Sequence, residues 1–380
     1  VSFGQKPSVS PTPLPSTLPR TNRIKDFGSS LEKYEKKKQK KESQTQQKSS
    51  EPVDDETIQV KTDLVVSDAL VTDQKSNVIV NLKKEDFIVT EDGAPQTIEM
   101  FSAGENVTIP RSIVLIIDYT MPQAPYVKNS INAARILVDK LNPNDKMAIV
   151  TNYLNLRLDF TTDKTLLKQT LNLIEKQVVD VPGGGDFNTL LAVLNEMFDE
   201  KDRQRIIIFQ SDGSGIIWLK QDKEHPYPVS YATRYNSGMK WLGEEKSMQR
   251  FGFSEIKEAI ERSGATIYSV IPGIKFLGFS EKEQLARAKI TLMEAAKFNG
   301  WNTSLTIERQ YAEAERKTAG QTAMFRVAEL SGGNAGFIEK SEDAENIYSD
   351  IFTVIKNRYV IGYYPTNQNR NGKRRSIKIE

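Results

Sequence analysis

Residues Arg111 to Pro122 read RSIVLIIDYTMP, and this stretch decides the fold of the chain. Ser112 to Ile117 form a short, almost wholly apolar run rich in β-branched residues, the pattern of a strand buried on both faces of a parallel sheet. The run ends abruptly at Asp118, and a helical pattern follows. Open α/β sheets bind ligands at the carboxyl ends of their strands. We therefore expect Asp118 to be the first residue of a metal or ligand site at one edge of a doubly wound sheet.

The segment around this stretch alternates apolar strands with amphipathic helices, which is typical of an α/β fold with a doubly wound, mostly parallel sheet. We expect further strands at 146–153, 154–161, 205–210, 265–273 and 334–339. The helical spacing predicts helices at 126–141, 163–176, 187–199, 255–263 and 342–357, with two more between 281 and 331 that break near Gly300.

The flanks of this α/β segment predict a second, all-β module. Residues 57–103 alternate apolar and polar side chains and predict about four antiparallel strands, with a turn at Glu91–Pro95. Four strands are few for a self-sufficient sandwich, so we expect the strand pair at the end of the chain to complete it. The predicted domains are a tail at 1–56, a β module at 57–108, an α/β domain at 109–357 and closing strands at 358–380.

The composition excludes several classes of function. The net charge of +2 is close to neutral, so nothing global indicates nucleic-acid binding. The chain has no cysteine, which excludes disulfides and thiolate metal sites, and its single histidine, His225, is expected to be a loop residue. No apolar run is long enough for a transmembrane segment. The Pro-rich, then lysine-rich first 56 residues predict a solvated tail, whose Lys33–Lys41 run is a candidate contact for an acidic surface.

Oxygen-bearing side chains gather on three loops that should meet at the carboxyl edge of the sheet. The loops are 118–122, 183–189 and 211–215. Such a set, without nitrogen or sulphur donors, suits Mg²⁺, Mn²⁺ or Ca²⁺. The residues are Asp118, Thr120, Asp186, Asn188, Thr189, Ser211 and Asp212.

This combination of a strand followed by Asp, a Gly-rich loop before a helix, and an apolar strand ending in Ser-Asp-Gly resembles a von Willebrand factor A (VWFA) domain. The flanks are similar to VWFA-related proteins of the acidobacterial type, and the resemblance covers roughly residues 57–380. The sequences that carry it are LVVSDALVTD, EDFIVTEDGAPQTIEMFS, FRVAELSGGNAGF and RYVIGYYPTN followed by GKRRSIKIE.

The resemblance implies a metal-ion-dependent adhesion site with Asp-x-Ser-x-Ser on the first loop, Thr on the second and Asp on the third. Asp118 matches the first position, Thr120 supplies the second hydroxyl, and Asp212 matches the third loop, whereas Pro122 replaces the remaining serine. Helical register favours Asn188 for the second loop, with Thr189 one place away. The implied site is therefore degenerate, with Mg²⁺, Mn²⁺ or Ca²⁺ as its ion. The alternative is that the aspartates only cap loops and helix ends.

The long connection Gly213–Phe253 is a candidate partner-binding loop, because exposed aromatic side chains are typical of protein-recognition surfaces. The alternative is an insertion that packs its aromatics on its own domain. The residues concerned are Trp218, Tyr227, Tyr231, Tyr235 and Trp241.

The sequence favours a non-enzymatic protein-binding module, with another protein as its partner. An aspartate-loop phosphatase would need a second aspartate two residues after Asp118, and the glycine run at 183–185 has neither the preceding buried strand nor the lysine of a phosphate-binding loop. The alternative function is a metal-free structural or accessory subunit of an envelope or membrane-associated complex. The resemblance also implies an extracytoplasmic, periplasmic or secreted location.

Overall fold

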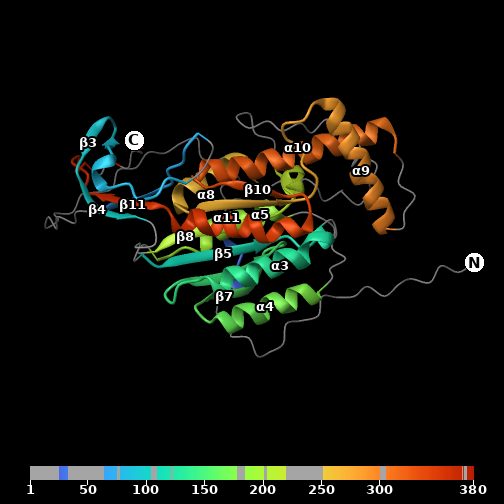
Figure 1. Ribbon diagram of the computed structural model, residues 1–380, viewed down its shortest axis with the longest axis horizontal. Coiled ribbons are helices and arrows are strands. Elements are labelled where there is room, and N and C mark those ends of the chain that lie inside the picture. The colour runs from blue at the N-terminus through green and yellow to red at the C-terminus, as the bar shows by residue number, and fades with distance from the viewer. Residues whose placement is uncertain are drawn as a thin grey trace, which may run out of the picture. The chain divides into compact units, whose positions relative to one another are not determined.

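The chain divides into two compact units, and the computed structural model shown in Figure 1 describes most of both. The first unit contains residues Val1–Glu35 and Arg111–Ile347, and the second contains Lys36–Pro110 and Tyr348–Glu380. The described residues are 25–32, 64–74, 78–103, 109–120, 123–177, 185–200, 203–219, 251–299, 305–369, 371 and 375–380.

The first unit is built on a six-stranded sheet in the order β10-β9-β8-β5-β6-β7. All neighbouring strands are parallel except β7, which runs antiparallel to β6 at one edge. The sheet confirms the predicted doubly wound, mostly parallel architecture, including the alternating strand at the edge. The strands are β5 (Arg111–Ile117), β6 (Lys146–Thr151), β7 (Asn155–Thr161), β8 (Gln204–Gln210), β9 (Thr266–Pro272) and β10 (Ala335–Ile338).

Helices cover both faces of this sheet (Figure 1). On one side lie α3 (Ala124–Asp139) and α4 (Lys164–Lys176), and on the other lie α5 (Asp186–Glu196), α8 (Phe253–Ser263) and α10 (Ile307–Leu330). α9 (Glu281–Asn299) packs along α10, so the two helices predicted between 281 and 331 are present. The remaining helical elements are η5 (Ser214–Trp218), η7 (Ser341–Asp343) and α11 (Ala344–Lys356).

Strand β5 is fully buried along its length, as its apolar sequence predicts. Successive side chains of a strand point to opposite faces, so Val114 and Ile116 pack in the cluster formed with α5, α8 and α10. At the amino end of β5, the buried Arg111 guanidinium pairs with Asp145, 2.9 Å between Nη2 and Oδ2. This ion pair ties β5 to the turn before β6 at the end of the sheet opposite to Asp118.

The second unit contains two three-stranded antiparallel sheets, β1-β11-β4 and β12-β2-β3. The predicted turn after Glu91 is confirmed: Asp92 and Gly93 have φ values of 50° and 82°, the left-handed pair that a tight hairpin requires. Phe87, Val89, Ile98, Tyr359, Ile361 and Tyr363 form the buried cluster of this unit. The elements are β1 (Val65–Ala69), η2 (Lys84–Asp86), β2 (Val89–Glu91), β3 (Ala94–Gln96), β4 (Ile98–Ala103), β11 (Tyr359–Tyr363) and β12 (Ile377–Ile379).

Each of these sheets joins strands from both ends of the chain. β11 lies between β1 and β4, and β12 pairs with β2. A closed sandwich made of the two sheets remains a prediction.

A short piece of the amino-terminal segment packs on the first unit. Around η1 (Ser29–Leu31), the side chains of Phe27 and Leu31 are buried in the apolar cluster beside α5. The Glu196 carboxylate accepts hydrogen bonds from the backbone N–H groups of Gly28 and Ser30, each 2.8 Å long. Composition predicted a solvated tail here and did not reveal this anchoring segment. The Lys33–Lys41 run lies outside the described residues.

None of the helices in the described part of the chain combines the length and hydropathy needed to cross a bilayer.

Candidate functional site

Asp118 is placed by the end of the central strand. Its backbone N–H donates to the carbonyl of Gln210 at 3.0 Å, which continues the ladder between β5 and β8 by one residue. The chain then turns, and Asp118 Oδ1 accepts a hydrogen bond from the Thr120 N–H at 2.9 Å. Asp118 and Thr120 are each 1% exposed, so the predicted first pair lies together in the interior. The other carboxylate oxygen, Asp118 Oδ2, is buried and has no hydrogen-bond partner among the described residues.

Asp186 is the first residue of α5. The helix begins after Gly185, whose φ of 83° lies in the left-handed region that glycine adopts without strain. Asp186 Oδ2 accepts a hydrogen bond from the Ser211 hydroxyl at 2.5 Å. Its second oxygen, Oδ1, is buried and unpartnered within the described part of the chain. A carboxylate at a helix amino end is favoured by the helix dipole, but this one also turns toward β8.

Asp212 follows β8, as the sequence predicts. Its Oδ1 accepts the Ser214 N–H at 2.9 Å, while the preceding Ser211 hydroxyl accepts the Gly213 N–H at 3.0 Å. Ser211 therefore joins the third loop to Asp186. The loop lies at the carboxyl end of β8, beside the end of β5.

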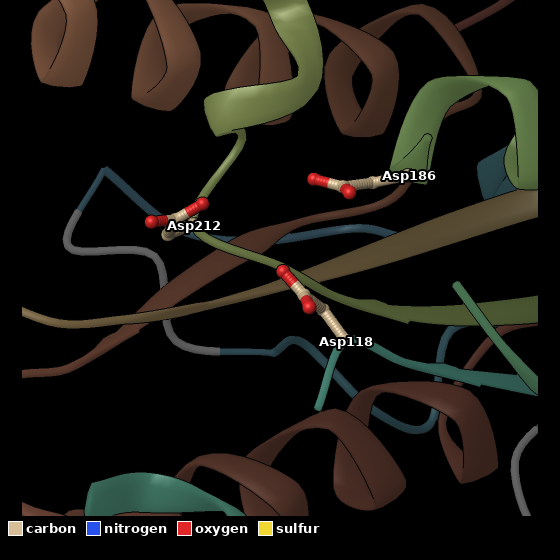
Figure 2. Close-up of side chains that lie close together, drawn as sticks. All are labelled: Asp118, Asp186 and Asp212. Atoms are coloured by element: carbon tan, nitrogen blue, oxygen red, sulfur yellow. The ribbon is translucent and has the colours of Figure 1, made fainter. Parts of the chain in front are cut away.

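The three aspartates converge on one spot at the carboxyl edge of the sheet (Figure 2). One carboxylate oxygen from each of Asp118, Asp186 and Asp212 lies within 4.8 Å of the others, and all three side chains are buried. Two unpartnered buried oxygens in such a cluster are costly unless a cation or protons satisfy them. An all-oxygen donor set of this kind fits a hard divalent cation such as Mg²⁺, Mn²⁺ or Ca²⁺.

The mutual repulsion of these carboxylates is visible in their pKa values. Burial, followed by the negative charges of Asp186 and Asp212, raises the pKa of Asp118 well above its ordinary value. Burial and the charge of Asp212 raise the pKa of Asp186 to about 6. Without a cation, both carboxyl groups therefore hold a proton to higher pH than an ordinary aspartate does, and a bound divalent ion would favour their ionised forms.

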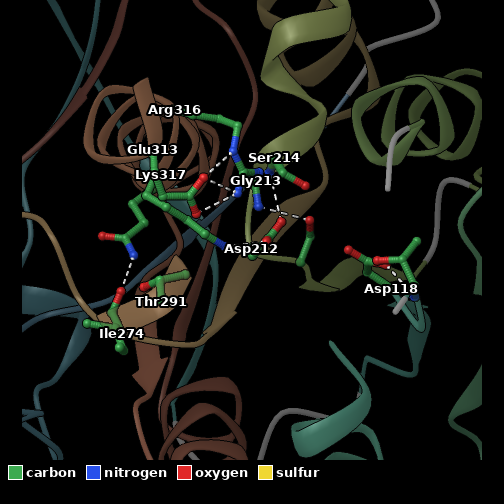
Figure 3. Close-up of polar contacts among 12 residues, drawn as sticks. Asp118, Asp212, Gly213, Ser214, Ile274, Thr291, Glu313, Arg316 and Lys317 are labelled. Carbon is green, nitrogen blue, oxygen red and sulfur yellow. Dashed lines mark hydrogen bonds and ion pairs between the residues drawn. The ribbon is translucent and has the colours of Figure 1, made fainter. Parts of the chain in front are cut away.

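Asp212 differs because it already has a cationic partner. Lys317 of α10 places its Nζ 2.7 Å from Asp212 Oδ2, and both side chains are largely buried (Figure 3). Burial alone would raise the pKa of Asp212, but Lys317 and then Arg316 hold it well below its ordinary value. Arg316 itself makes a two-pronged ion pair with Glu313 one turn earlier on the same helix.

A glycine-to-glycine contact sets the position of α10 against this loop. A Cβ on Gly213 would lie 2.3 Å from the Gly320 carbonyl oxygen, and a Cβ on Gly320 would lie 2.6 Å from that of Gly213. The Gln321 side chain adds a second anchor, because it donates to the Ile274 carbonyl and accepts the Phe276 N–H, each at 2.8 Å. The backbones touch, and Lys317 stands one turn before Gly320 on α10.

Asn188 and Thr189, predicted to supply the second-loop ligand, have other surroundings. The Thr189 hydroxyl donates to the Gly185 carbonyl at 3.0 Å and accepts the Leu154 N–H at 3.2 Å, so it fastens α5 to the β6–β7 turn. Asn188 is half-buried on α5. Asp186, two positions earlier than Asn188, is the second-loop residue in the acidic cluster. A ligand role for Asn188 or Thr189 stays a prediction.

The predicted partner-binding aromatics are not tested by the structure. Tyr227, Tyr231, Tyr235 and Trp241 lie outside the described residues, as do Pro122 and His225. Trp218 ends η5, but its side chain is not among the described groups. The site that the structure places together is therefore formed by the short loops after β5 and β8 and by the start of α5.

Two residues at this edge were not found by sequence reasoning, Lys317 and Tyr153. Tyr153 and Leu154 have φ values of 60° and 56°, an uncommon conformation for side chains of this size, in the turn between β6 and β7. Partial burial and the charges of Asp186 and Asp118 raise the pKa of Tyr153 to about 12. No spacing rule identified Lys317, because it lies 105 positions away from Asp212 along the chain.

No family model matches the chain, and no curated protein matches it either. Solved structures similar to it include BatB from Bacteroides thetaiotaomicron, 13% identical with a TM-score of 0.38, covering 66% of this chain and 100% of that one. The vWF domain of the type V pili tip protein Mfa5 from Porphyromonas gingivalis is 12% identical with a TM-score of 0.37, covering 66% and 96%. Manganese-loaded TRAP from Plasmodium vivax is 11% identical with a TM-score of 0.28, covering 48% and 61%.

At these identities and TM-scores, the similarities carry no conclusion about this chain, and its fold is described from its own sheet. The fold of the first unit is von Willebrand A-like: a mostly parallel six-stranded sheet lies between helical layers, and an aspartate directly follows its central strand.

Proposed function

We propose that this chain is a non-enzymatic protein-binding module that engages its partner at the carboxyl edge of the six-stranded sheet, through a divalent cation. The observation that carries the proposal is the convergence of three buried aspartates from three separate loops, two of which keep a buried oxygen without a partner among the described residues. Capping the three loops separately would need one carboxylate on each loop, but it would not need the three carboxylates to be buried side by side, which costs free energy.

Asp118, Asp186 and Asp212 would hold the ion, with Thr120 beside Asp118 as a source of a further oxygen. When bound, the cation supplies a Lewis-acidic point to which a carboxylate of another protein can coordinate. Each aspartate is oriented by a hydrogen bond from its own surroundings. The donors are the Ser211 hydroxyl for Asp186, the Ser214 N–H for Asp212 and the Thr120 N–H for Asp118. Such orientation of the ligands is what gives a metal site its geometry and affinity.

Binding rather than catalysis is the better interpretation of this edge. The described groups around the aspartates are carboxylates, hydroxyls, a lysine paired with Asp212 and a tyrosine whose pKa is raised. The Ser211 hydroxyl donates to Asp186 and accepts the Gly213 N–H, so its hydrogen bonds join two elements of the site. The aromatic side chains of the Gly213–Phe253 segment remain proposed contacts for the partner, and an extracytoplasmic location remains part of the proposal.

A metal-free structural or accessory subunit is the second candidate, and one specific observation favours it. Lys317 already supplies a positive charge to Asp212, so part of the charge that an ion would provide comes from the protein itself. In that case partner binding would be the same with and without divalent cations.

Affinity capture with cation control separates the two candidates. The immobilised chain and an Asp118→Asn variant are exposed to a detergent extract of the source cells, once with Mn²⁺ and once with EDTA, after circular dichroism shows equal folding. The proposal expects a protein retained by the unmodified chain with Mn²⁺ and lost both with EDTA and in the variant. A retained set that is identical under all conditions contradicts the cation-dependent module and favours the accessory subunit.

A further inference from the structure

We propose that Lys317 is a built-in competitor for the divalent cation: Asp212 is bound either by the Lys317 ammonium or by the ion, so that loading the site withdraws Lys317 from Asp212. The inference rests on the proposed function, since it names how the same site is regulated.

The geometry places the two cations on the same carboxylate. Asp212 contributes an oxygen to the acidic cluster, and its Oδ2 is 2.7 Å from Lys317 Nζ. Its other oxygen, Oδ1, accepts the Ser214 N–H, so neither oxygen is left uncommitted. A divalent ion that coordinates Asp212 must therefore share or displace one of these two partners. The Ser214 bond belongs to the loop backbone, whereas Lys317 has a long, flexible side chain that can move away.

Charge supports the same conclusion. The Lys317 ammonium lies 2.7 Å from Asp212 and so places a positive charge directly beside the cluster of three aspartates. An ammonium and a divalent ion close to each other on one carboxylate repel strongly in a buried site. The loaded site is more favourable when the ammonium moves off, and the empty site is more favourable when it stays.

The position of α10 makes this exchange a structural signal. Lys317 lies one turn before Gly320 on α10, and the backbone of Gly320 touches that of Gly213, the residue directly after Asp212. Arg316, next to Lys317, is already held by Glu313 and is not free to take the same place. Release of Lys317 thus removes an ion pair between α10 and the loop of the metal site, while the glycine contact remains as a pivot.

Mn²⁺ titration followed by electron paramagnetic resonance tests the competition. The variants are Lys317→Gln, which keeps a hydrogen-bond donor for Asp212, and Lys317→Met, which removes it. Lys289→Met on the exposed side of α9 is the matched control, because it removes the same charge away from Asp212. We expect both Lys317 variants to bind Mn²⁺ at least tenfold more tightly than the unmodified chain, and Lys289→Met to bind it as the unmodified chain does.

Amine footprinting provides the second measurement. Acetylation of Lys317 by an N-hydroxysuccinimide ester should speed up several-fold in the unmodified chain when Mn²⁺ is added, while acetylation of Lys289 stays constant. Unchanged or weaker Mn²⁺ binding in both Lys317 variants, or a Lys317 that stays equally protected with Mn²⁺, overturns the competition even though the site binds metal. If none of the proteins binds Mn²⁺, the cation-dependent function itself fails, and the inference fails with it.

Discussion

The Lys317 Nζ lies 2.7 Å from Asp212 Oδ2, whereas Asp118 and Asp186 each keep a buried oxygen that no described group satisfies. One of the three clustered carboxylates thus carries its own counter-ion, and the other two do not. Because uncompensated buried charge destabilises a protein, this asymmetry has consequences that can be measured without knowing the partner.

Asp186→Asn should stabilise the metal-free protein at neutral pH, by on the order of 2 kcal/mol. The substitution removes a buried like charge, and the amide oxygen can still accept the hydrogen bond from Ser211. Urea unfolding in EDTA measures the effect. The contrasting variant is Asp145→Asn, because that carboxylate is equally buried but paired with Arg111, so its loss should cost about 3 kcal/mol. If both variants destabilise the protein, the negative charges of Asp118, Asp186 and Asp212 are already compensated in the metal-free protein, and the prediction is wrong.

The metal-free protein should be more stable near about pH 5.5 than near about pH 7.5. Folding raises the pKa of Asp186 to about 6, so the folded state holds a proton that the unfolded chain releases at about 3.9. This contribution to stability is complete below the lower value and is lost as pH rises through the higher one. Asp118, whose pKa is raised further, acts in the same direction. Thermal unfolding in EDTA at several pH values checks the trend, and Asp186→Asn should flatten it.

Gly213→Ala should destabilise the first unit by about 3 kcal/mol or more. The new Cβ would combine a left-handed backbone, φ 71°, with a contact of 2.3 Å to the Gly320 carbonyl oxygen. Gly264→Ala is the matched control, since its φ is 62° and the atom nearest to an added Cβ is the flexible tip of the Arg205 side chain, at 3.9 Å. That variant should lose only about 1 kcal/mol from backbone strain. Equal losses in the two variants would remove the glycine contact as the feature that positions α10.

Phe27→Ala should destabilise the first unit by about 3 kcal/mol, because the ring is buried in the cluster beside α5. Lys25→Ala, an exposed change two residues earlier, should have little effect. Limited proteolysis gives an independent measurement, since release of residues 25–32 from Glu196 should open a cleavage site there. A Phe27→Ala protein as stable and as resistant as the unmodified chain would show that the segment is not anchored.

Local patterns predicted the sheet because each strand of the first unit carries its own signal. The apolar run ending at Asp118 and the one ending before Ser211 are long enough and β-branched enough to identify buried parallel strands without tertiary information. The same logic correctly placed Asp118, Thr120 and Asp212 at one edge, because carboxyl ends of parallel strands coincide.

The residues that complete the site were harder to predict, since their roles depend on where a loop or helix ends in space. The sequence placed Asp186 at the opening of a helix, one residue before the predicted start, but its convergence with Asp118 and Asp212 depends on how the chain enters α5 after Gly185. Lys317 is brought to Asp212 by a backbone contact between two glycines, which leaves no trace in hydrophobic periodicity. The burial of Phe27 and Leu31 was not predicted either, because the two apolar residues stand in a polar, low-complexity segment without a helical or strand period.

Direct measurement of Mn²⁺ binding by electron paramagnetic resonance tests the cation site most directly. We predict one bound Mn²⁺ per unmodified chain, displaced by excess Mg²⁺ and lost in Asp186→Asn, with a thermal stabilisation of about 2.7 kcal/mol at 100 times the dissociation constant. Absence of bound Mn²⁺, or binding that is unchanged when Asp186 is replaced, would contradict a cation site formed by Asp118, Asp186 and Asp212.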